Sequence, residues 1–286
     1  MNLKMKTAAT LLALTSTFAN AQLALNVYQA APTSFNVTST LITGEKEAIL
    51  IDTGFTRADA LRIAANILDS NKKLTTIFIS QADPDYYFGA ETLQKIFPTA
   101  KIVTTPAVRH EIAEKMAQKV AFWGKQMGDN APKKPVLPEN IEGTTLTLEN
   151  EIIEVKGTKG TLANRPYLWI PSLKTITGNV AIYGDMHLWT ADSASKTSRQ
   201  AWIEQLNEMA ALKPEIVIAG HMTSGTKQDI TAIEFSKNYL NTFEKAVESS
   251  RNSQDVIEKM EQAYPNLPEK GNLELGAKVV MGEMKW

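Results

Sequence analysis

The sequence lacks cysteine altogether and contains only three histidines among its 286 residues. The absence of cysteine excludes a disulfide scaffold and is consistent with an oxidising compartment, where a stray thiol is a liability. Neither charge sign is in excess, because 30 Lys and Arg residues face 31 Asp and Glu residues. Nucleic acid is therefore not an expected partner, and a small neutral or polar molecule is. The composition leaves the oligomeric state open.

Two motifs of common enzyme classes are missing as well. The chain has no Gly-x-Ser-x-Gly elbow of the kind that carries a serine nucleophile, and no glycine-rich loop that could cradle a phosphate. Serine-hydrolase and nucleotide-binding functions therefore have no support in the sequence.

No hydrophobic run is long enough for a stable membrane anchor. The longest candidate, Thr7 to Phe18, has 12 residues, whereas a membrane-spanning helix needs about 20. This stretch follows two lysines, Lys4 and Lys6, and precedes the small residues Ala19-Asn20-Ala21. The pattern predicts a signal peptide over residues 1–21, cleaved before Gln22, and a periplasmic or secreted protein.

Strand and helix patterns alternate along the first half of the remaining chain. Apolar, β-branched runs predict strands at 37–42, 48–51, 75–80 and 101–104. Between them, Thr56 is placed to cap a helix over 56–68 whose apolar stripe is Ala60, Ile63, Ala64 and Ile67. This order predicts an α/β fold in which helices pack on a sheet.

The second half returns to strands and then ends in helices. Strands are expected at 145–148, 152–155, 167–170, 175–177 and 216–218, and helices at 199–212, 228–249 and 255–264. The segment 130–138 contains three prolines and is expected to be a loop, either a surface connector or a lid. No linker composition separates the halves, so we expect one domain over 22–286 with a C-terminal helical extension.

Four segments in this order resemble the metallo-β-lactamase superfamily. They are Asp52-Thr53-Gly54, the segment Gln81-Ala82-Asp83-Pro84-Asp85-Tyr86, Gly178-Asn179, and Gly220-His221. The resemblance implies a four-layer αβ/βα sandwich with a site in the groove at the sheet edges. It also implies hydrolysis by a hydroxide held on one or two zinc ions, since a bound metal lowers the pKa of water to about 7.

The metal-binding pattern of that family is altered at almost every ligand. Where the family carries His-x-His-x-Asp-His, this chain has Gln81, Asp83, Asp85 and Tyr86. The bridging aspartate falls on Asn179, and only His221 remains among the later ligands. Three histidines cannot supply an ordinary dizinc site, which leaves one divalent ion, Zn²⁺, Mn²⁺ or Fe²⁺, or no metal at all.

The expected site residues follow from this comparison. The expected metal ligands are Asp83, Asp85, His221 and Gln81; the expected catalytic residues are Asp85, Tyr86 and His187; the expected supporting residues are Asp52, Asn179 and Asp185. His187 is alternatively a structural residue bonded to Asp185.

Two functions remain open from the sequence. One is an exported hydrolase with at most a single metal, acting on a small ester, lactone or amide. The other is a non-catalytic small-molecule-binding protein that has kept the groove and lost the metal.

Overall fold

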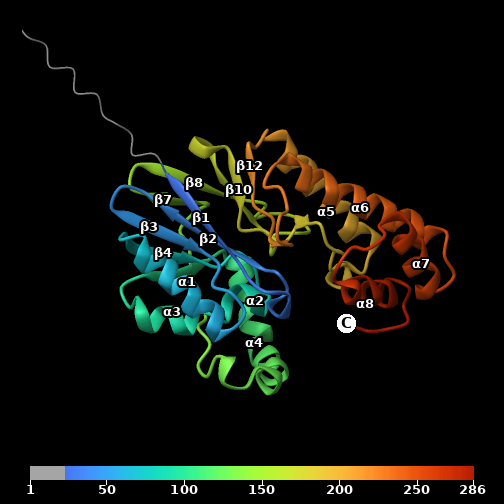
Figure 1. Ribbon diagram of the computed structural model, residues 1–286, viewed down its shortest axis with the longest axis horizontal. Helices are drawn as coiled ribbons and strands as arrows, with labels where there is room; N and C mark the ends of the chain where they lie inside the picture. Colours follow the sequence, from blue (N-terminus) through green and yellow to red (C-terminus); the bar gives the residue numbers. More distant parts are fainter. Residues whose placement is uncertain (1–22) are drawn as a thin grey trace, which may run out of the picture.

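The computed structural model describes residues 23–286, so the expected signal peptide lies outside the described residues. Two β-sheets stack on each other, and helices cover the outer face of each one (Figure 1). This is the four-layer αβ/βα sandwich expected from the sequence. None of the helices in the described part of the chain combines the length and hydrophobicity needed to span a membrane.

The first sheet has six strands in the order β1-β2-β3-β4-β5-β6. The strands are β1 (Ala24–Gln29), β2 (Thr38–Thr43), β3 (Glu47–Ile51), β4 (Lys73–Phe78), β5 (Lys101–Thr104) and β6 (Glu139–Asn140). The β1–β2 and β2–β3 pairs are antiparallel, and the pairs from β3 to β6 are parallel. Because β3, β4 and β5 run in the same direction, the loops that follow them meet at one sheet edge.

Burial on both faces explains the continuous apolar run in β3. Ile49 and Ile51 face the core between the sheets, whereas Leu50 faces the helices. Those helices are α1 (Arg57–Asp69), α3 (Ala90–Ile96) and α4 (Pro106–Met127). The expected cap of α1 is confirmed, because the Thr56 side chain and Asp59 form a reciprocal capping box. The four stripe residues expected on α1 are buried.

The second sheet has five strands in the order β12-β10-β9-β8-β7. Their bounds are β7 (Thr145–Leu148), β8 (Glu151–Lys156), β9 (Tyr167–Ile170), β10 (Thr175–Thr177) and β12 (Ile216–Val217). Leu148, Ile153 and Leu168 of this sheet pack with Ile42, Ile51 and Phe78 of the first. A short parallel pair, β11 (Tyr183–Gly184) and β13 (His221–Met222), lies beside these two sheets.

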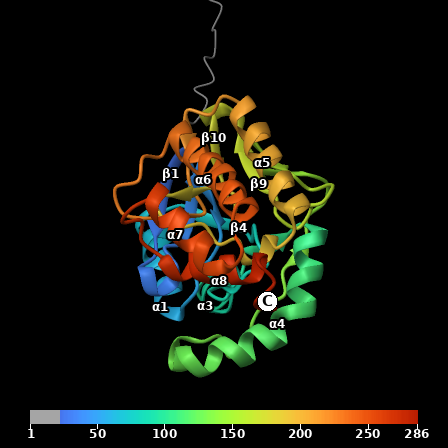
Figure 2. The same cartoon turned by 90° about the vertical axis from the view of Figure 1, so that its right-hand side faces the viewer.

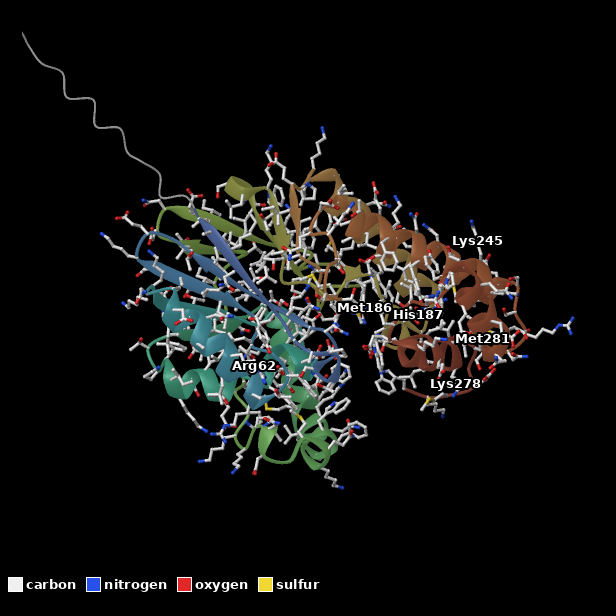
Figure 3. All side chains as sticks on the ribbon, viewed as in Figure 1. Arg62, Met186, His187, Lys245, Lys278 and Met281 are labelled. Atoms are coloured by element: carbon white, nitrogen blue, oxygen red, sulfur yellow. The ribbon has the colours of Figure 1, made fainter. Side chains whose placement is uncertain are left out.

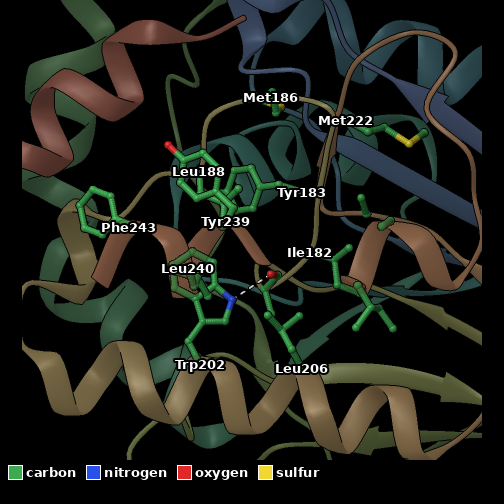
Figure 4. Packing of buried hydrophobic residues seen from close by; sticks show 14 of the residues in the cluster. Ile182, Tyr183, Met186, Leu188, Trp202, Leu206, Met222, Tyr239, Leu240 and Phe243 are labelled. Atoms are coloured by element: carbon green, nitrogen blue, oxygen red, sulfur yellow. Dashed lines mark hydrogen bonds between the residues drawn. The ribbon is translucent and has the colours of Figure 1, made fainter. Parts of the chain in front are cut away.

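The outer layer of the second half is built from four helices. They are α5 (Lys196–Ala211), α6 (Ile230–Glu248), α7 (Ser253–Ala263) and α8 (Lys270–Val280). Figure 2 shows α6, α7 and α8 together on one side of the molecule. Tyr239, Leu240 and Phe243 of α6 pack against Trp202 and Leu206 of α5 (Figure 4). The indole of Trp202 also donates a hydrogen bond to the Ala181 carbonyl oxygen at 2.8 Å.

Four segments differ from the sequence-based expectation or extend it. Strand β1 was not expected, and β2 begins at Thr38 because Val37 makes only an isolated bridge with His221. The segment after residue 270 forms α8, which packs on α7 of the same chain. The proline-containing loop 130–138 connects α4 to β6, and the Lys133 and Lys134 backbone N–H groups donate to Glu91 of α3.

Candidate functional site

Asp52 ties together the loops that follow β3 and β4. It adopts a left-handed backbone conformation, with φ of 62°, which turns the chain sharply at the strand end. Its carboxylate accepts hydrogen bonds from the Ser80 backbone N–H and hydroxyl, both at 2.7 Å. Burial raises the pKa of Asp52 to about 8, although the Ser80 hydrogen bonds oppose the shift. Asp52 therefore joins the end of β3 to Ser80 after β4, and its supporting role in the site stays a prediction.

Tyr86 lies on the short helix α2 (Pro84–Tyr87), which begins directly after Asp83. Its backbone carbonyl accepts from the Thr53 N–H at 2.8 Å and from the Thr53 hydroxyl at 3.0 Å. Its own hydroxyl is buried, 3.0 Å from Nε2 of His221 and 3.2 Å from the Asn179 carbonyl oxygen. A tyrosine hydroxyl thus contacts the imidazole inside the site.

Both ring nitrogens of His221 are engaged. Nδ1 lies 2.8 Å from the Phe35 carbonyl oxygen and therefore carries the proton that this acceptor requires. Nε2 is then the acceptor for the Tyr86 hydroxyl. The ring of Tyr183 stacks on the imidazole with centroids 5.1 Å apart. Burial lowers the pKa of His221, which favours the neutral ring.

Asp85 approaches the same imidazole. One of its carboxylate oxygens, Oδ2, lies 3.5 Å from Nε2 of His221, and only 9% of each side chain is exposed. Burial raises the pKa of Asp85, and the nearby Lys119 ammonium opposes this shift. Asp83 points toward a cation instead, because its Oδ1 lies 3.7 Å from Nζ of Lys119 on α4.

Gln81 and Asn179 are held by the backbone around them. The Gln81 amide donates to the Pro166 carbonyl oxygen at 2.9 Å, which joins the loop after β4 to the start of β9. The Asn179 amide donates to the Ile218 carbonyl oxygen at 3.0 Å and accepts from the Ile182 N–H at 2.9 Å. The Asn179 side chain therefore closes a turn, whereas the aspartate at this position in the family bridges two metal ions. Asp185 is exposed, with φ of 54°, on the loop after β11.

His187 belongs to a different part of the molecule. Its Nδ1 lies 2.8 Å from the Tyr239 hydroxyl on α6, and its backbone bonds to Pro268 and Asn272. Figure 3 places it beside the C-terminal helices. The alternative bond to Asp185 is absent among the hydrogen bonds of residues 23–286, and the partner of the imidazole is Tyr239. Burial lowers the pKa of His187 to about 4.

A polar cavity of about 100 Å³ lies next to Asp83. Its walls come from the loop after β4, from α4, from the loop between β8 and β9, and from the turn at Ala191–Ser193. Five of its polar residues were not identified from the sequence as site residues: Glu111, Lys115, Asn164, Arg165 and Asp192. One sequence pattern could have indicated part of this wall. Glu111, Lys115 and Lys119 are spaced four residues apart, and residues with that spacing share one face of a helix.

Comparison with known proteins identifies the family. A family model described as the metallo-beta-lactamase superfamily matches residues 32–221. This chain belongs to that superfamily. Among curated proteins no sequence matches it.

Solved structures of superfamily members share the fold at low sequence identity. A metallo-beta-lactamase family protein from Thermus thermophilus has a TM-score of 0.60 at 15% identity, covering 91% of this chain and 93% of its own. The DIM-1 metallo-beta-lactamase has a TM-score of 0.55 at 17% identity, covering 77% and 93%. A metallo-beta-lactamase from Pontibacter korlensis has a TM-score of 0.53 at 16% identity, covering 79% and 97%. These likenesses establish the fold.

The donor set of this superfamily member does not fit a resident metal ion. Among the four expected ligands, Asp85 and His221 approach each other to 3.5 Å. The Gln81 amide and the Asp83 carboxylate have other partners, Pro166 and Lys119. In residues 23–286 no group of three or more His, Cys, Asp and Glu side chains is arranged to hold a metal, whereas protein zinc sites take three or four such ligands.

Proposed function

We propose that this chain is a small-molecule-binding member of the superfamily. In it, cationic side chains of the groove compensate the carboxylate charges that a metal ion would otherwise compensate. The observation that carries the proposal is the pairing of Asp83 with Lys119 at 3.7 Å, beside a polar cavity that also contains Lys115 and Arg165. A lysine near the carboxylates lowers their mutual repulsion, as a metal ion otherwise would.

The proposed setting is outside the cytoplasm. The support is the sequence pattern of residues 1–21, which is typical of a cleaved leader before Gln22 and of a periplasmic or secreted protein. The proposed partner is a small molecule rather than nucleic acid or a membrane, because the near-neutral charge offers no general attraction to polyanions.

Metal analysis and thermal unfolding test this proposal together. Protein purified without chelator is expected to contain far less than one metal ion per chain, and neither EDTA nor added Zn²⁺ should move its Tm. A set of small polar molecules should include one that raises Tm, because a ligand that binds only the native state stabilises it. About one metal per chain, or a fall of Tm with EDTA, would contradict the proposal.

A rebuilt variant serves as the positive control for this assay. The double substitution Gln81→His and Tyr86→His returns two imidazoles to the loop after β4, beside Asp85 and His221. Zinc is expected to raise the Tm of this variant, because its donor set then contains three imidazoles and a carboxylate.

Hydrolysis of a small ester, lactone or amide is the second candidate function. The observation that favours it is the approach of Asp85 Oδ2 to His221 Nε2 at 3.5 Å, with the Tyr86 hydroxyl on the same nitrogen. The single divalent ion expected from the sequence, Zn²⁺, Mn²⁺ or Fe²⁺, belongs to this candidate. His187 has no role in this candidate function, because its contacts lie in the C-terminal helical layer.

Chelator-sensitive esterase activity decides between the two candidates. Activity that EDTA abolishes and that Asp85→Asn removes would support the hydrolase. The matched control is Asp69→Asn, because Asp69 is an exposed aspartate at the end of α1. Absence of activity, combined with ligand-dependent stabilisation, would support the binding function.

A further inference from the structure

The charges around the polar cavity do not cancel within the cavity. Its walls carry Asp83, Glu111, Asp192, Lys115 and Arg165. The partners of each group show which hydrogen-bonding atoms are already occupied and which remain for a ligand.

Glu111 and Lys115 are satisfied by each other and by Asn164. Lys115 Nζ lies 2.6 Å from Oε1 of Glu111, one helical turn away on α4. The other Glu111 oxygen accepts from the Asn164 amide at 2.6 Å. This part of the wall is therefore neutral, with both carboxylate oxygens occupied.

Both carboxylate oxygens of Asp192 accept hydrogen bonds from indoles, which occupy these oxygens without neutralising their charge. One carboxylate oxygen accepts from Nε1 of Trp189 at 2.7 Å, and the other accepts from Nε1 of Trp286 at 2.8 Å. The two indole rings also pack edge to face, with centroids 5.1 Å apart. Each Asp192 carboxylate oxygen thus already has a hydrogen-bond donor from a tryptophan.

Arg165 is positioned by neutral groups only. Its guanidinium donates to the Ser193 hydroxyl at 2.8 Å and to the Asp192 backbone carbonyl oxygen at 3.3 Å. It also lies 5.9 Å from the ring centroid of Trp202. No carboxylate of residues 23–286 lies within 4.0 Å of it. A guanidinium held in this way keeps its charge available for an anion.

Asp83 is the acidic group of the cavity whose carboxylate is partly exposed. Among the ion pairs of residues 23–286 its partner is Lys119 at 3.7 Å, and 41% of its side chain is exposed. It precedes α2 without making a side-chain cap. Within the described residues no hydrogen-bond donor is assigned to its carboxylate, so at least one oxygen can accept from a ligand.

The two walls are joined by fixed backbone contacts. The Gln81 amide bonds the Pro166 carbonyl oxygen at 2.9 Å, and the Gln205 amide bonds the Arg165 carbonyl oxygen at 2.8 Å. The guanidinium and the carboxylate are thus held on loops that are tied together and to α5. A site whose charged groups are already positioned loses less free energy to ordering when a ligand binds.

We propose that this cavity binds a small zwitterion of the α-amino-acid type, whose carboxylate pairs with Arg165 and whose ammonium group pairs with Asp83. This inference rests on the small-molecule-binding function proposed above and names its ligand class. A simple anion would satisfy Arg165 and be repelled by Asp83, whereas a simple cation would do the reverse. A ligand with both charges gives Arg165 an anionic partner and adds a hydrogen-bond donor to the Asp83 carboxylate, which has Lys119 at 3.7 Å.

Calorimetric titration and thermal unfolding with matched probes test the ligand class. The probes are the twenty common L-amino acids, with propionate and ethylamine as L-alanine analogues that each lack one charged group. At least one amino acid is expected to raise Tm and bind measurably. Removal of either charge should weaken binding by about tenfold or more, the usual loss when a charge-assisted hydrogen-bonded pair is left incomplete.

Two substitutions assign the charges to their walls. Arg165→Gln is expected to abolish the difference in affinity between L-alanine and ethylamine. Asp83→Asn is expected to abolish the difference in affinity between L-alanine and propionate. If a larger amino acid binds instead of L-alanine, its own decarboxylated and deaminated analogues replace these probes. The matched controls are Arg57→Gln and Asp69→Asn, both at exposed positions of α1. The Tm of each variant without ligand verifies that it folds.

The outcomes separate this inference from the proposed function. The zwitterion inference is overturned if an anion or a neutral molecule binds at least as tightly as the amino acid with the highest affinity. The proposed binding function would still stand in that case. The same holds if no amino acid binds but another small molecule raises Tm. If no probe of any charge class stabilises the protein, the binding function itself fails.

Discussion

The buried imidazole of His187 makes the stability of this protein sensitive to acid. The side chain is completely buried, and its Nε2 has no hydrogen-bond partner among residues 23–286. Glu261 and Lys270 are the nearby charged groups, and they act in opposite directions. Burial dominates and lowers the pKa to about 4, against about 6.5 in an unfolded chain.

The sign of the effect follows from proton binding. Above pH 6.5 the imidazole is neutral in both states, and no penalty arises. As the pH falls from about 6.5 to about 4, His187 binds a proton in the unfolded chain but stays neutral in the native state. The free energy of unfolding therefore falls, by about 3 kcal/mol at most. His187→Gln is expected to flatten this dependence in urea unfolding measured at pH 8 and pH 5.

The control for that experiment is the exposed histidine of α4. His110 lies on the surface, where it contacts Glu114. His110→Gln should leave the acid dependence of the wild type unchanged. An unaltered slope in His187→Gln would show that other groups cause the acid sensitivity.

At the scale of elements, the turn before β13 positions His221 through a close backbone contact. A Cβ atom on Gly220 would lie 1.9 Å from the Asn179 carbonyl oxygen. The Tyr86 hydroxyl lies near the same spot, at 2.8 Å. Because a backbone oxygen cannot move aside like the end of a flexible side chain, only glycine allows β13 to approach this loop.

Gly220→Ala is therefore expected to destabilise the protein by about 2 kcal/mol or more, because it overpacks a backbone contact. The measurement is the free energy of unfolding from urea denaturation. Gly271→Ala on α8 is the matched control, since a Cβ there meets nothing within 4 Å; helix propensity predicts no loss at that position. Equal stability of the two variants would exclude the steric explanation.

Across the whole molecule, the C-terminal helices share one hydrophobic core with the second sheet. Leu273 and Ala277 of α8 belong to the same buried cluster as Trp202 of α5 and Ile176 of β10. This continuity supports the expectation of a single domain with a helical extension, which remains a prediction. A shared core predicts that the extension and the sandwich unfold together.

Leu273→Ala tests this coupling. Deletion of a fully buried leucine side chain is expected to cost about 2 to 4 kcal/mol. The loss should appear as a lower Tm of one calorimetric transition whose calorimetric and van't Hoff enthalpies agree. Leu68→Ala, at a position 60% exposed on α1, is the control and should change little. A separate early transition for the helices would contradict the single-domain prediction.

The elements of this fold were predictable where their causes are local. The Thr56 cap, the apolar stripe of α1 and the buried run of β3 were all anticipated, because capping and periodicity depend on residues a few positions apart. Strand β1 was missed, since its burial alternates only in part. Strand β12 falls within the strand expected at 216–218, whereas the two-residue strand β13 forms only through its pairing with β11.

The site was predictable only where it is contiguous in sequence. The segment Gln81–Tyr86 and the Gly220-His221 turn supplied the Asp85, Tyr86 and His221 cluster. His187 was assigned to the groove from its sequence neighbours, yet its partner is Tyr239, 52 positions further along the chain. A hydrogen bond over such a separation leaves no local sequence pattern.

The amino-acid sequence by itself determined that the fold is α/β and that an ordinary dizinc site is excluded, because strand periodicity, helix caps and a count of histidines require no coordinates. The αβ/βα layering followed from the resemblance to the superfamily. Only the tertiary structure decided which charged side chains gather beside Asp83. Lys119, Arg165 and Asp192 come from three segments that meet Asp83 once the sheets have stacked. Charge compensation depends on distances of a few ångströms, and those distances are set by packing rather than by order along the chain.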